Sequence, residues 1–116
     1  MSLRLFYRRY IDTCNAHRFD ALGEFVATDV VVNEEPIGLT GYESGLQAIV
    51  DEIPDFRWDL RHLLVDGDWL AAHLFDTGTH APTGCPVSTH EFAVYRLSDG
   101  KIAEVWGDLR VLEQLR

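Results

Sequence analysis

The sequence has few basic residues and no long apolar run, and both shortages limit the partners it can have. Ten lysines and arginines stand against nineteen aspartates and glutamates, which leaves a formal net charge of −9 over 116 residues. Nucleic acids and anionic membranes attract proteins through concentrated positive charge, so neither is an expected partner. No stretch approaches the roughly 18 apolar residues of a membrane span, and the N-terminus has no signal-peptide core. We therefore expect a cytoplasmic protein.

Cysteine is also scarce, and the common cofactor motifs are missing. The two cysteines, Cys14 and Cys85, have a spacing that fits neither a metal knuckle nor a CxxC redox pair. Glycine-rich nucleotide loops, the HExxH zinc motif and the GxSxG nucleophile motif are absent. His80, within THAPTGC, has no Cys or Asp at the spacing that would complete a metal site. Any chemistry is therefore expected to use no cofactor and no metal.

The composition is that of an ordinary globular protein, with 47% hydrophobic and 25% charged residues. At this length we expect a single domain over residues 1–116. Apolar residues at three- and four-residue steps predict a helix from Leu3 to Cys14, which would bury the Cys14 thiol. A short helix, ALGEFVA, follows with Asp20 as its cap. DVVVNEE then predicts a strand that ends at Pro36.

The second half of the chain changes from helical to strand periodicity. A third helix is predicted to begin at Thr40, where Thr followed by Glu43 fits a capping box, and to stop at Pro54. Turn signals then separate four antiparallel strand candidates, at about 56–65, 69–79, 88–97 and 101–109. This order predicts an α+β domain, in which three N-terminal helices pack on a strongly curved, mainly antiparallel sheet. A cavity is expected at the open end of that sheet.

Alternation along the first two of these strands predicts which side chains line the cavity. A two-residue turn at 66–67 or 67–68 would place one set of residues on a common face. Its members are Phe56, Trp58, Leu60, His62, Leu64, Trp69, Ala71, His73, Phe75 and Thr77. Because imidazole titrates near neutrality, His73 is a candidate general base. His62 would lie beside it on the same face and could assist it. The structural alternative is a histidine held by a backbone carbonyl or a tyrosine hydroxyl.

The register of the last hairpin decides where Asp108 points. A three-residue loop with a glycine bulge at 98–100 would place His90 opposite Asp108. A two-residue turn at 99–100 would instead place Asp108 beside the odd-numbered residues of 91–97. Only the first register supplies a histidine with an orienting carboxylate, which is the minimum for a positioned base.

The same hairpin carries bulky apolar side chains on its even-numbered face. Phe92, Val94 and Trp106 exceed what a solvated sheet surface needs and suit an interface between two copies of the chain. In the three-residue-loop register, Arg96 and Glu104 would pair diagonally on this face. We therefore expect a homodimer formed through the sheet, with Glu104 and Trp106 buried in it.

Three short motifs stand in the second half of the chain: a GTH triplet at 78–80, an F-x-x-x-R pattern from Phe92 to Arg96, and DGKIAEVW at 99–106. With the helical first half, they resemble the SnoaL-like branch of the NTF2-like superfamily over essentially the whole chain. The resemblance implies a cone-shaped α+β barrel, a deep apolar pocket and dimerisation through the sheet. Characterised members include polyketide cyclases, which close a ring by an aldol step with an aspartate acid/base and a nearby histidine. Relatives include epoxide hydrolases, which activate water with an Asp-Arg-Asp set, and ketosteroid isomerases.

The chain departs from these relatives at the reacting positions. The aspartate of the cyclase HWD pattern falls on Gly107, and the cyclase histidine falls near Ala93. Asp108 is one residue late, so it would face the other side of the strand unless a bulge rotates it. The hydrolase Arg-x-Asp pattern falls on His73 and Phe75. Neither mechanism transfers intact.

We therefore expect a SnoaL-like enzyme that uses cofactor-free acid/base chemistry on an apolar substrate with a carbonyl group or ring, of cyclase, isomerase or hydrolase type. His73 is the expected base, assisted by Asp108 or His62. Asn33 and the Tyr10 hydroxyl would polarise a developing oxyanion, although Asn33 can equally cap a strand end. The other residues expected to bind substrate are Trp58, Trp69, Phe75 and His90. The alternatives are a non-catalytic ligand-binding module and an epoxide hydrolase-like enzyme.

Overall fold

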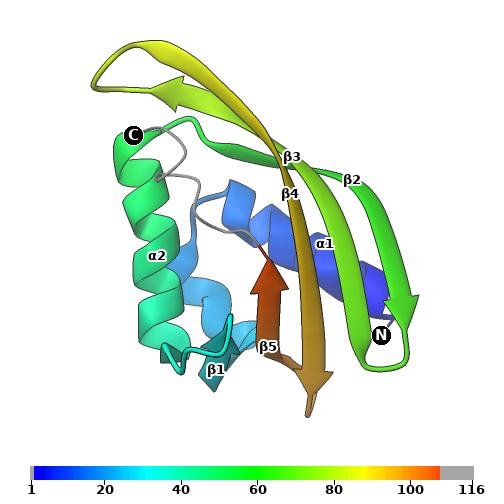
Figure 1. Cartoon of the computed structure of the whole chain (residues 1–116). Coiled ribbons are helices and arrows are strands. Elements are labelled where there is room, and N and C mark those ends of the chain that lie inside the picture. The colour runs from blue at the N-terminus through cyan, green and yellow to red at the C-terminus, as the bar shows by residue number, and fades with distance from the viewer. Residues whose placement is uncertain (1, 108–116) are drawn as a thin grey trace.

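The computed structural model describes residues 2–107, in which helices pack on one face of a five-stranded sheet (Figure 1). Two α-helices, α1 (Leu3–Asn15) and α2 (Gly38–Glu52), flank a short 3₁₀-helix, η1 (Phe19–Glu24). The strands are β1 (Val26–Val32), β2 (Arg57–Asp66), β3 (Trp69–His80), β4 (Cys85–Ser98) and β5 (Lys101–Gly107). The predicted α+β class, with helices on a mainly antiparallel curved sheet, is confirmed.

The sheet brings the first strand beside the last. Its strand order is β1-β5-β4-β3-β2, and β1 runs parallel to β5 while the other neighbours are antiparallel. The long β3–β4 hairpin curves over α1, so the helices lie on the inner side of the curve (Figure 1). Side chains on the inner face of the sheet therefore meet the helices, and those on the outer face meet solvent.

Two predicted helix starts are wrong. The short helix η1 begins at Phe19 without a side-chain cap, so Asp20 lies inside it and does not cap it. The Ser2 hydroxyl accepts a hydrogen bond from the Leu5 backbone N–H and so caps α1. Thr40, the expected cap of α2, lies inside that helix, which begins at Gly38 without any side-chain cap. The tight turn after β1 feeds the chain into the helix earlier than the capping pattern suggested. Within the described residues, no helix is long and apolar enough to cross a bilayer.

The core lies between the helices and the inner face of the sheet. From α1 it takes the predicted stripe, with Tyr7, Tyr10, Ile11 and Cys14 all buried. Burial raises the pKa of the Cys14 thiol to about 12, so this cysteine is an inert core residue as expected. The sheet contributes Val26, Val30, Trp58, Leu63, Leu70, Ala72, Leu74, Ala93, Tyr95, Leu97, Ile102 and Val105.

A bulge in β2 changes which alternate residues of that strand point to the inner face and which point to the outer face. The pairing of β2 with β3 shifts by one between Leu60 and His62, which leaves Arg61 as an extra residue. Because strand side chains alternate, Trp58 points to the buried inner face while His62 points outward beside His73. The prediction that Trp58 shares a face with His62 and His73 is therefore wrong.

The last hairpin combines features of both predicted registers. Asp99 and Gly100 have φ angles of +53° and +77°, as a two-residue turn with two left-handed positions requires. A bulge follows, with Ala103 as the extra residue, and it restores the alternation expected for the longer loop. Arg96 therefore lies directly opposite Glu104, not diagonal to it, and its Nε donates to Oε2 of Glu104 at 2.8 Å.

Candidate active site in the sheet interior

The inner face of the sheet holds two buried acidic side chains, Asp76 of β3 and Glu91 of β4, which are 0% and 7% exposed. Asp76 pairs with Thr89 and Leu74 pairs with Glu91, so the two acids are diagonal neighbours on one face. Neither carboxyl oxygen of Asp76 has a hydrogen-bond partner among residues 2–107. Burial raises the pKa of Asp76 above its ordinary value of 3.8, and the opposing effects of Glu91 and His90 do not cancel that rise.

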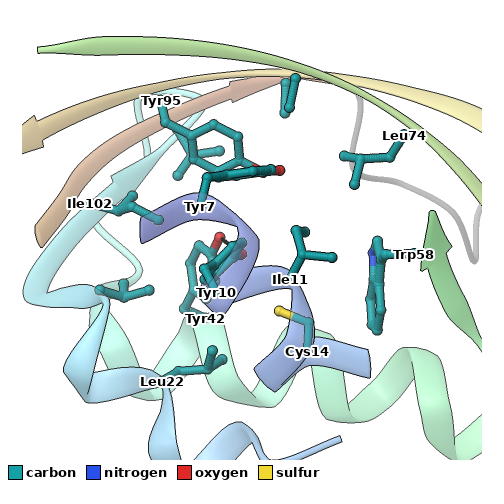
Figure 2. Close-up of a cluster of buried hydrophobic side chains, with 14 of the residues drawn as sticks. Tyr7, Tyr10, Ile11, Cys14, Leu22, Tyr42, Trp58, Leu74, Tyr95 and Ile102 are labelled. Atoms are coloured by element: carbon teal, nitrogen blue, oxygen red, sulfur yellow. Dashed lines mark hydrogen bonds between the residues drawn. The ribbon is translucent and has the colours of Figure 1, made fainter. Parts of the chain in front are cut away.

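All four tyrosines of the chain lie in the same interior, and their hydroxyls are joined in pairs (Figure 2). The Tyr7 hydroxyl donates to the Tyr95 hydroxyl at 2.9 Å, and the Tyr10 and Tyr42 hydroxyls are 2.5 Å apart. Burial raises the pKa of all four, so they remain neutral hydrogen-bond donors. The charge of Glu91 adds to this rise for Tyr7, Tyr42 and Tyr95, because its carboxyl lies close to their hydroxyls.

Apolar and aromatic side chains surround these polar groups. Trp58 packs edge-on against Phe56, with ring centroids 4.7 Å apart, and Figure 2 shows it pointing into the interior opposite Ile11 and Cys14. The interior therefore combines apolar walls with a few convergent hydroxyl and carboxyl groups. That combination is typical of sites that bind a mostly apolar molecule and orient its polar group.

The outer face carries a different polar cluster, which we call the histidine row: His62 of β2, His73 of β3 and His90 of β4. Nδ1 of His62 lies 2.9 Å from Nδ1 of His73, and Nε2 of His73 lies 2.8 Å from Nδ1 of His90. His73 is half-buried between the other two and stacks on Phe92, with ring centroids 4.6 Å apart. Among the described residues, no group of three or more His, Cys, Asp or Glu side chains is arranged to hold a metal ion.

Comparison with known proteins identifies the family. The model of the SnoaL-like polyketide cyclase family matches residues 4–116. A SnoaL-like polyketide cyclase from Agrobacterium tumefaciens is 32% identical, and the match covers 100% of this chain and 99% of that one with a TM-score of 0.88. The chain belongs to the SnoaL-like polyketide cyclase family.

More distant structures share the fold alone. IdmH from Streptomyces antibioticus is 23% identical with a TM-score of 0.85, and the match covers 99% of each chain. TsrD from Streptomyces laurentii is 17% identical with a TM-score of 0.84, over 97% of this chain and 92% of that one. Among curated proteins, none matched the sequence.

This SnoaL-like chain has no room for a side chain where the resemblance places the cyclase aspartate. That position is Gly107, and a Cβ built there would lie 2.5 Å from the carbonyl oxygen of Phe92 and 3.1 Å from Cα of Ala93. A carboxylate for acid/base chemistry must therefore come from another position. The neighbouring candidate, Asp108, lies outside the described residues, and so does its predicted pairing with His90.

In this SnoaL-like chain, the Asn33 side chain, just after β1, forms hydrogen bonds with the backbone of a neighbouring strand. Its Nδ2 donates to the carbonyl oxygen of Gly107 at 2.9 Å, and its Oδ1 accepts from the Gly107 N–H at 3.0 Å. The side-chain amide is thus paired with the backbone at the end of β5 and ties the two parallel strands together. This geometry fits the strand-end interpretation of Asn33.

The other predicted site residues divide between the two faces of the sheet. Tyr10 and Trp58 lie in the interior, and their role in substrate binding stays a prediction. The remainder lie on the outer face: His62, His73, His90, Trp69 and Phe75. The prediction that His73 faces the cavity is wrong because β3 buries its other side, Leu70, Ala72, Leu74 and Asp76. The roles predicted for His73 and His62 required the inner face, so neither enters the proposal below.

Sequence reasoning missed Asp76 and Glu91. The signal for Asp76 was its place in β3, where it continues the alternation of Leu70, Ala72 and Leu74 toward the core. An acidic residue on the apolar side of a strand is rare unless it is paired or functional. The aromatic residues on the other side of β3 made that side look like the buried one.

Proposed function

We propose that this SnoaL-like protein is an enzyme that uses acid/base chemistry, without a cofactor, on a mostly apolar small molecule carrying a carbonyl group, in a cyclase- or isomerase-type reaction. The observation that carries the proposal is Asp76, a fully buried carboxyl group without a hydrogen-bond partner among residues 2–107. Leaving a buried polar group unpaired costs about 1–3 kcal/mol. Buried carboxyl groups with a raised pKa are candidates for functional sites.

Asp76 has the properties of a general base in this proposal. A raised pKa makes its carboxylate a stronger base near neutral pH than an exposed aspartate. The carboxylate removes a proton from the carbon next to the substrate carbonyl; the C–H bonding electrons form a carbon–carbon double bond, and the π electrons of the carbonyl move onto its oxygen to give an enolate. Where the enolate is conjugated with a carbon–carbon double bond, return of that proton to the far carbon of the conjugated system shifts the double bond and gives an isomer. Attack of the enolate carbon on a second carbonyl closes a ring, and the new alkoxide takes up the proton.

The tyrosine hydroxyls would stabilise the enolate oxygen. Burial keeps them protonated, and each pair uses one O–H in its own hydrogen bond, so one hydroxyl of each pair, Tyr95 in the first, can donate to a developing negative charge. Such donors act strongly in a water-poor interior, where removing one commonly costs about 10²- to 10³-fold in rate. Tyr10, predicted as a substrate-binding residue, belongs to this set through its contact with Tyr42.

The test is exchange of an α-proton in deuterated water, followed by NMR with a panel of aromatic 1,3-diketones as probes. Wild-type protein should exchange the proton, and Asp76→Asn should lower the rate by about 10²- to 10⁴-fold. The matched control is Asp59→Asn, because Asp59 is an exposed aspartate on the outer face, paired with Arg61. An Asp76→Asn protein that keeps the wild-type rate would overturn the proposal. Probe binding without exchange would support the alternative of a non-catalytic ligand-binding module.

We also propose that the outer face of the sheet forms a homodimer. Its apolar side chains lie side by side on β2, β3 and β4 and are well exposed: Leu64 is 69%, Phe92 63%, Trp69 41% and Val94 38% exposed. Contiguous apolar surface of this kind marks interaction sites on soluble proteins. An isologous dimer would cover the same residues on both copies.

The charges on the outer face favour a second copy of this chain as the partner. Arg61 is paired with Asp59 at 2.7 Å and Arg96 with Glu104 at 2.8 Å, so the charges are balanced within the face. A chain with a net charge of −9 repels its own copy least across such a balanced surface. The same net charge gives no support for a nucleic acid or membrane partner, and the cytoplasmic location stays a prediction.

A further inference from the structure

We propose that the histidine row makes self-association through the outer face depend on protonation, so that acid dissociates the homodimer. The inference rests on the homodimer proposed above and is independent of the reaction proposed for Asp76. It concerns the middle of the apolar outer face, where His73 lies between His62 and His90 and stacks on Phe92.

The hydrogen bonds of the row fit neutral imidazoles. A neutral imidazole has one N–H donor and one acceptor nitrogen, and His73 uses both of its nitrogens, at 2.9 Å and 2.8 Å from its neighbours. One added proton can be shared along the row, but a second makes two N–H groups face each other at one of these contacts. Two copies meeting across a two-fold axis would bring two rows into one interface.

The carboxylates of Asp59 and Glu104 on the outer face are already paired, and Asp76, on the inner side of β3, is a carboxyl group that attracts a charged His90. The pKa of His73 is lowered by burial first, and then by His90, His62 and Arg61. On β2, the carboxylate of Asp59 is already paired with Arg61. On β4 and β5, the Arg96 side chain lies on Glu104, which also accepts a hydrogen bond from the Trp106 indole. Phe75, the next outward residue on β3, is apolar and packs against His90 with the two rings tilted by 46°.

Burial in a dimer would disfavour the charged imidazoles further, so the dimer would bind fewer protons than two free monomers. By linkage, a fall in pH then favours the monomers. The rest of the chain works in the opposite direction, because acidification toward the pI near 4.8 reduces the net negative charge and its repulsion. Weaker association in acid is therefore a specific sign of the histidine row.

The test is sedimentation equilibrium at constant ionic strength from about pH 7.5 to about pH 5.5, a range that brackets the ordinary pKa of imidazole. A chelator is present throughout, because imidazoles also bind transition metals. The dissociation constant of the wild-type dimer should rise severalfold over this range, because each proton whose pKa falls by one unit on association changes the constant by at most about tenfold. Circular dichroism at each pH checks that the chain stays folded.

Glutamine variants assign the effect, because glutamine keeps a donor and an acceptor but cannot take up a proton. In the triple variant His62→Gln, His73→Gln, His90→Gln, the dissociation constant of the dimer should no longer rise in acid. In His73→Gln alone, that rise should be smaller than in the wild type. His80→Gln is the matched control and should keep the wild-type dependence, since His80 contacts the Thr83 hydroxyl at the far end of the β3–β4 hairpin. If the triple variant does not fold, His73→Gln decides.

The outcomes separate this inference from the proposals it stands beside. A dimer that is as tight or tighter at the acidic end overturns the role of the histidine row and leaves the homodimer standing. Acid weakening that persists unchanged in both glutamine variants also overturns it. A monomer at every pH overturns the homodimer and this inference together, while the exchange assay on Asp76 is unaffected.

Discussion

His73 and Asp76 lie three positions apart on β3 and point to opposite faces of the sheet. His73 is half-buried on the outer face, between the imidazoles of His62 and His90. Asp76 is 0% exposed on the inner face, beside Glu91. One strand thus supplies the central ionisable group of both proposals, the acid/base reaction in the interior and the proton-dependent association outside.

Replacing Asp76 by asparagine should stabilise the protein at alkaline pH. We expect Asp76→Asn to raise the free energy of unfolding by about 1–3 kcal/mol near pH 8, because it removes an unpaired buried carboxylate. The pKa of Asp76 is raised in the folded state, so the folded protein holds this proton more tightly than the unfolded chain. Wild-type stability therefore falls as pH rises from about 3.8 through the folded pKa.

The gain in Asp76→Asn should accordingly shrink toward zero as pH falls to 3.8, the ordinary pKa of the group. Urea unfolding of both proteins across this range measures the difference. Asp59→Asn, which changes an exposed carboxylate, should alter stability by less than about 1 kcal/mol at any pH. A loss of stability in Asp76→Asn near pH 8 would contradict the prediction.

The hydroxyl pair of Tyr7 and Tyr95 should appear as an energetic coupling. Each single change to phenylalanine leaves the partner hydroxyl buried without this hydrogen bond, which should cost about 1–3 kcal/mol. The double variant should cost less than the sum of the two, with a coupling energy of about 0.5–1.5 kcal/mol. Urea unfolding of the four proteins measures the cycle, and strictly additive losses would argue against the pair.

Gly78 should tolerate no side chain because the Ile53 side chain packs closely against it. A Cβ built there would lie 2.3 Å from Cγ2 of Ile53, so Gly78→Ala should lower the free energy of unfolding by about 1–3 kcal/mol. The matched control is Gly45→Ala within α2, where nothing lies within 4 Å of the added Cβ. That change should stabilise the helix by about 0.5–1 kcal/mol. Equal unfolding midpoints for the two variants in urea would refute this account of Gly78.

Asp55 should stabilise the fold only where it is ionised. It accepts hydrogen bonds from the Thr79 backbone N–H at 2.7 Å and from the Thr79 hydroxyl at 2.9 Å, and these contacts lower its pKa. A lowered pKa contributes stability that is fully present well above 3.8 and is lost as pH falls through the folded value.

Asp55→Asn should therefore lower the melting temperature at neutral pH, and the gap should close as the solution is acidified. Thr79→Val keeps the backbone donor and should have the smaller effect. Calorimetric melting between about pH 7 and about pH 3 spans the titration of an ordinary aspartate. A gap between wild type and Asp55→Asn that widens in acid would rule this explanation out.

Helix α1 was predictable because its signals are local, whereas the short helix predicted at 21–27 overlaps η1 only in part and extends into β1. Leu3 to Cys14 has one apolar stripe and one polar side, so only one orientation of α1 buries the stripe. The start of α2 was not predictable in the same way, because the helix begins at Gly38, soon after the turn that follows β1, and not at the capping pattern of Thr40. Asn33 was left between two roles, and the choice depended on Gly107, which is far away in the sequence and adjacent only in the sheet.

The face of β3 could not be assigned from its sequence. One side presents Leu70, Ala72 and Leu74, and the other presents Trp69, His73 and Phe75. Both sides are hydrophobic enough to be buried, since one packs on the helices and the other is exposed as an apolar surface. The polar residue that distinguishes them, Asp76, lies on the side that is buried.

The types and order of the elements, the sheet-rich second half and the family could be predicted from local patterns and short motifs. Tertiary structure decided which side chains share a space. Strand side chains alternate with a period of two, so the single extra residues Arg61 and Ala103 reverse the side of everything beyond them. These bulges follow from how the sheet curves around α1, which depends on packing between distant segments. In the folded protein, His62, His73 and His90 lie on the outer face, while the four tyrosines, Asp76 and Glu91 lie in the interior.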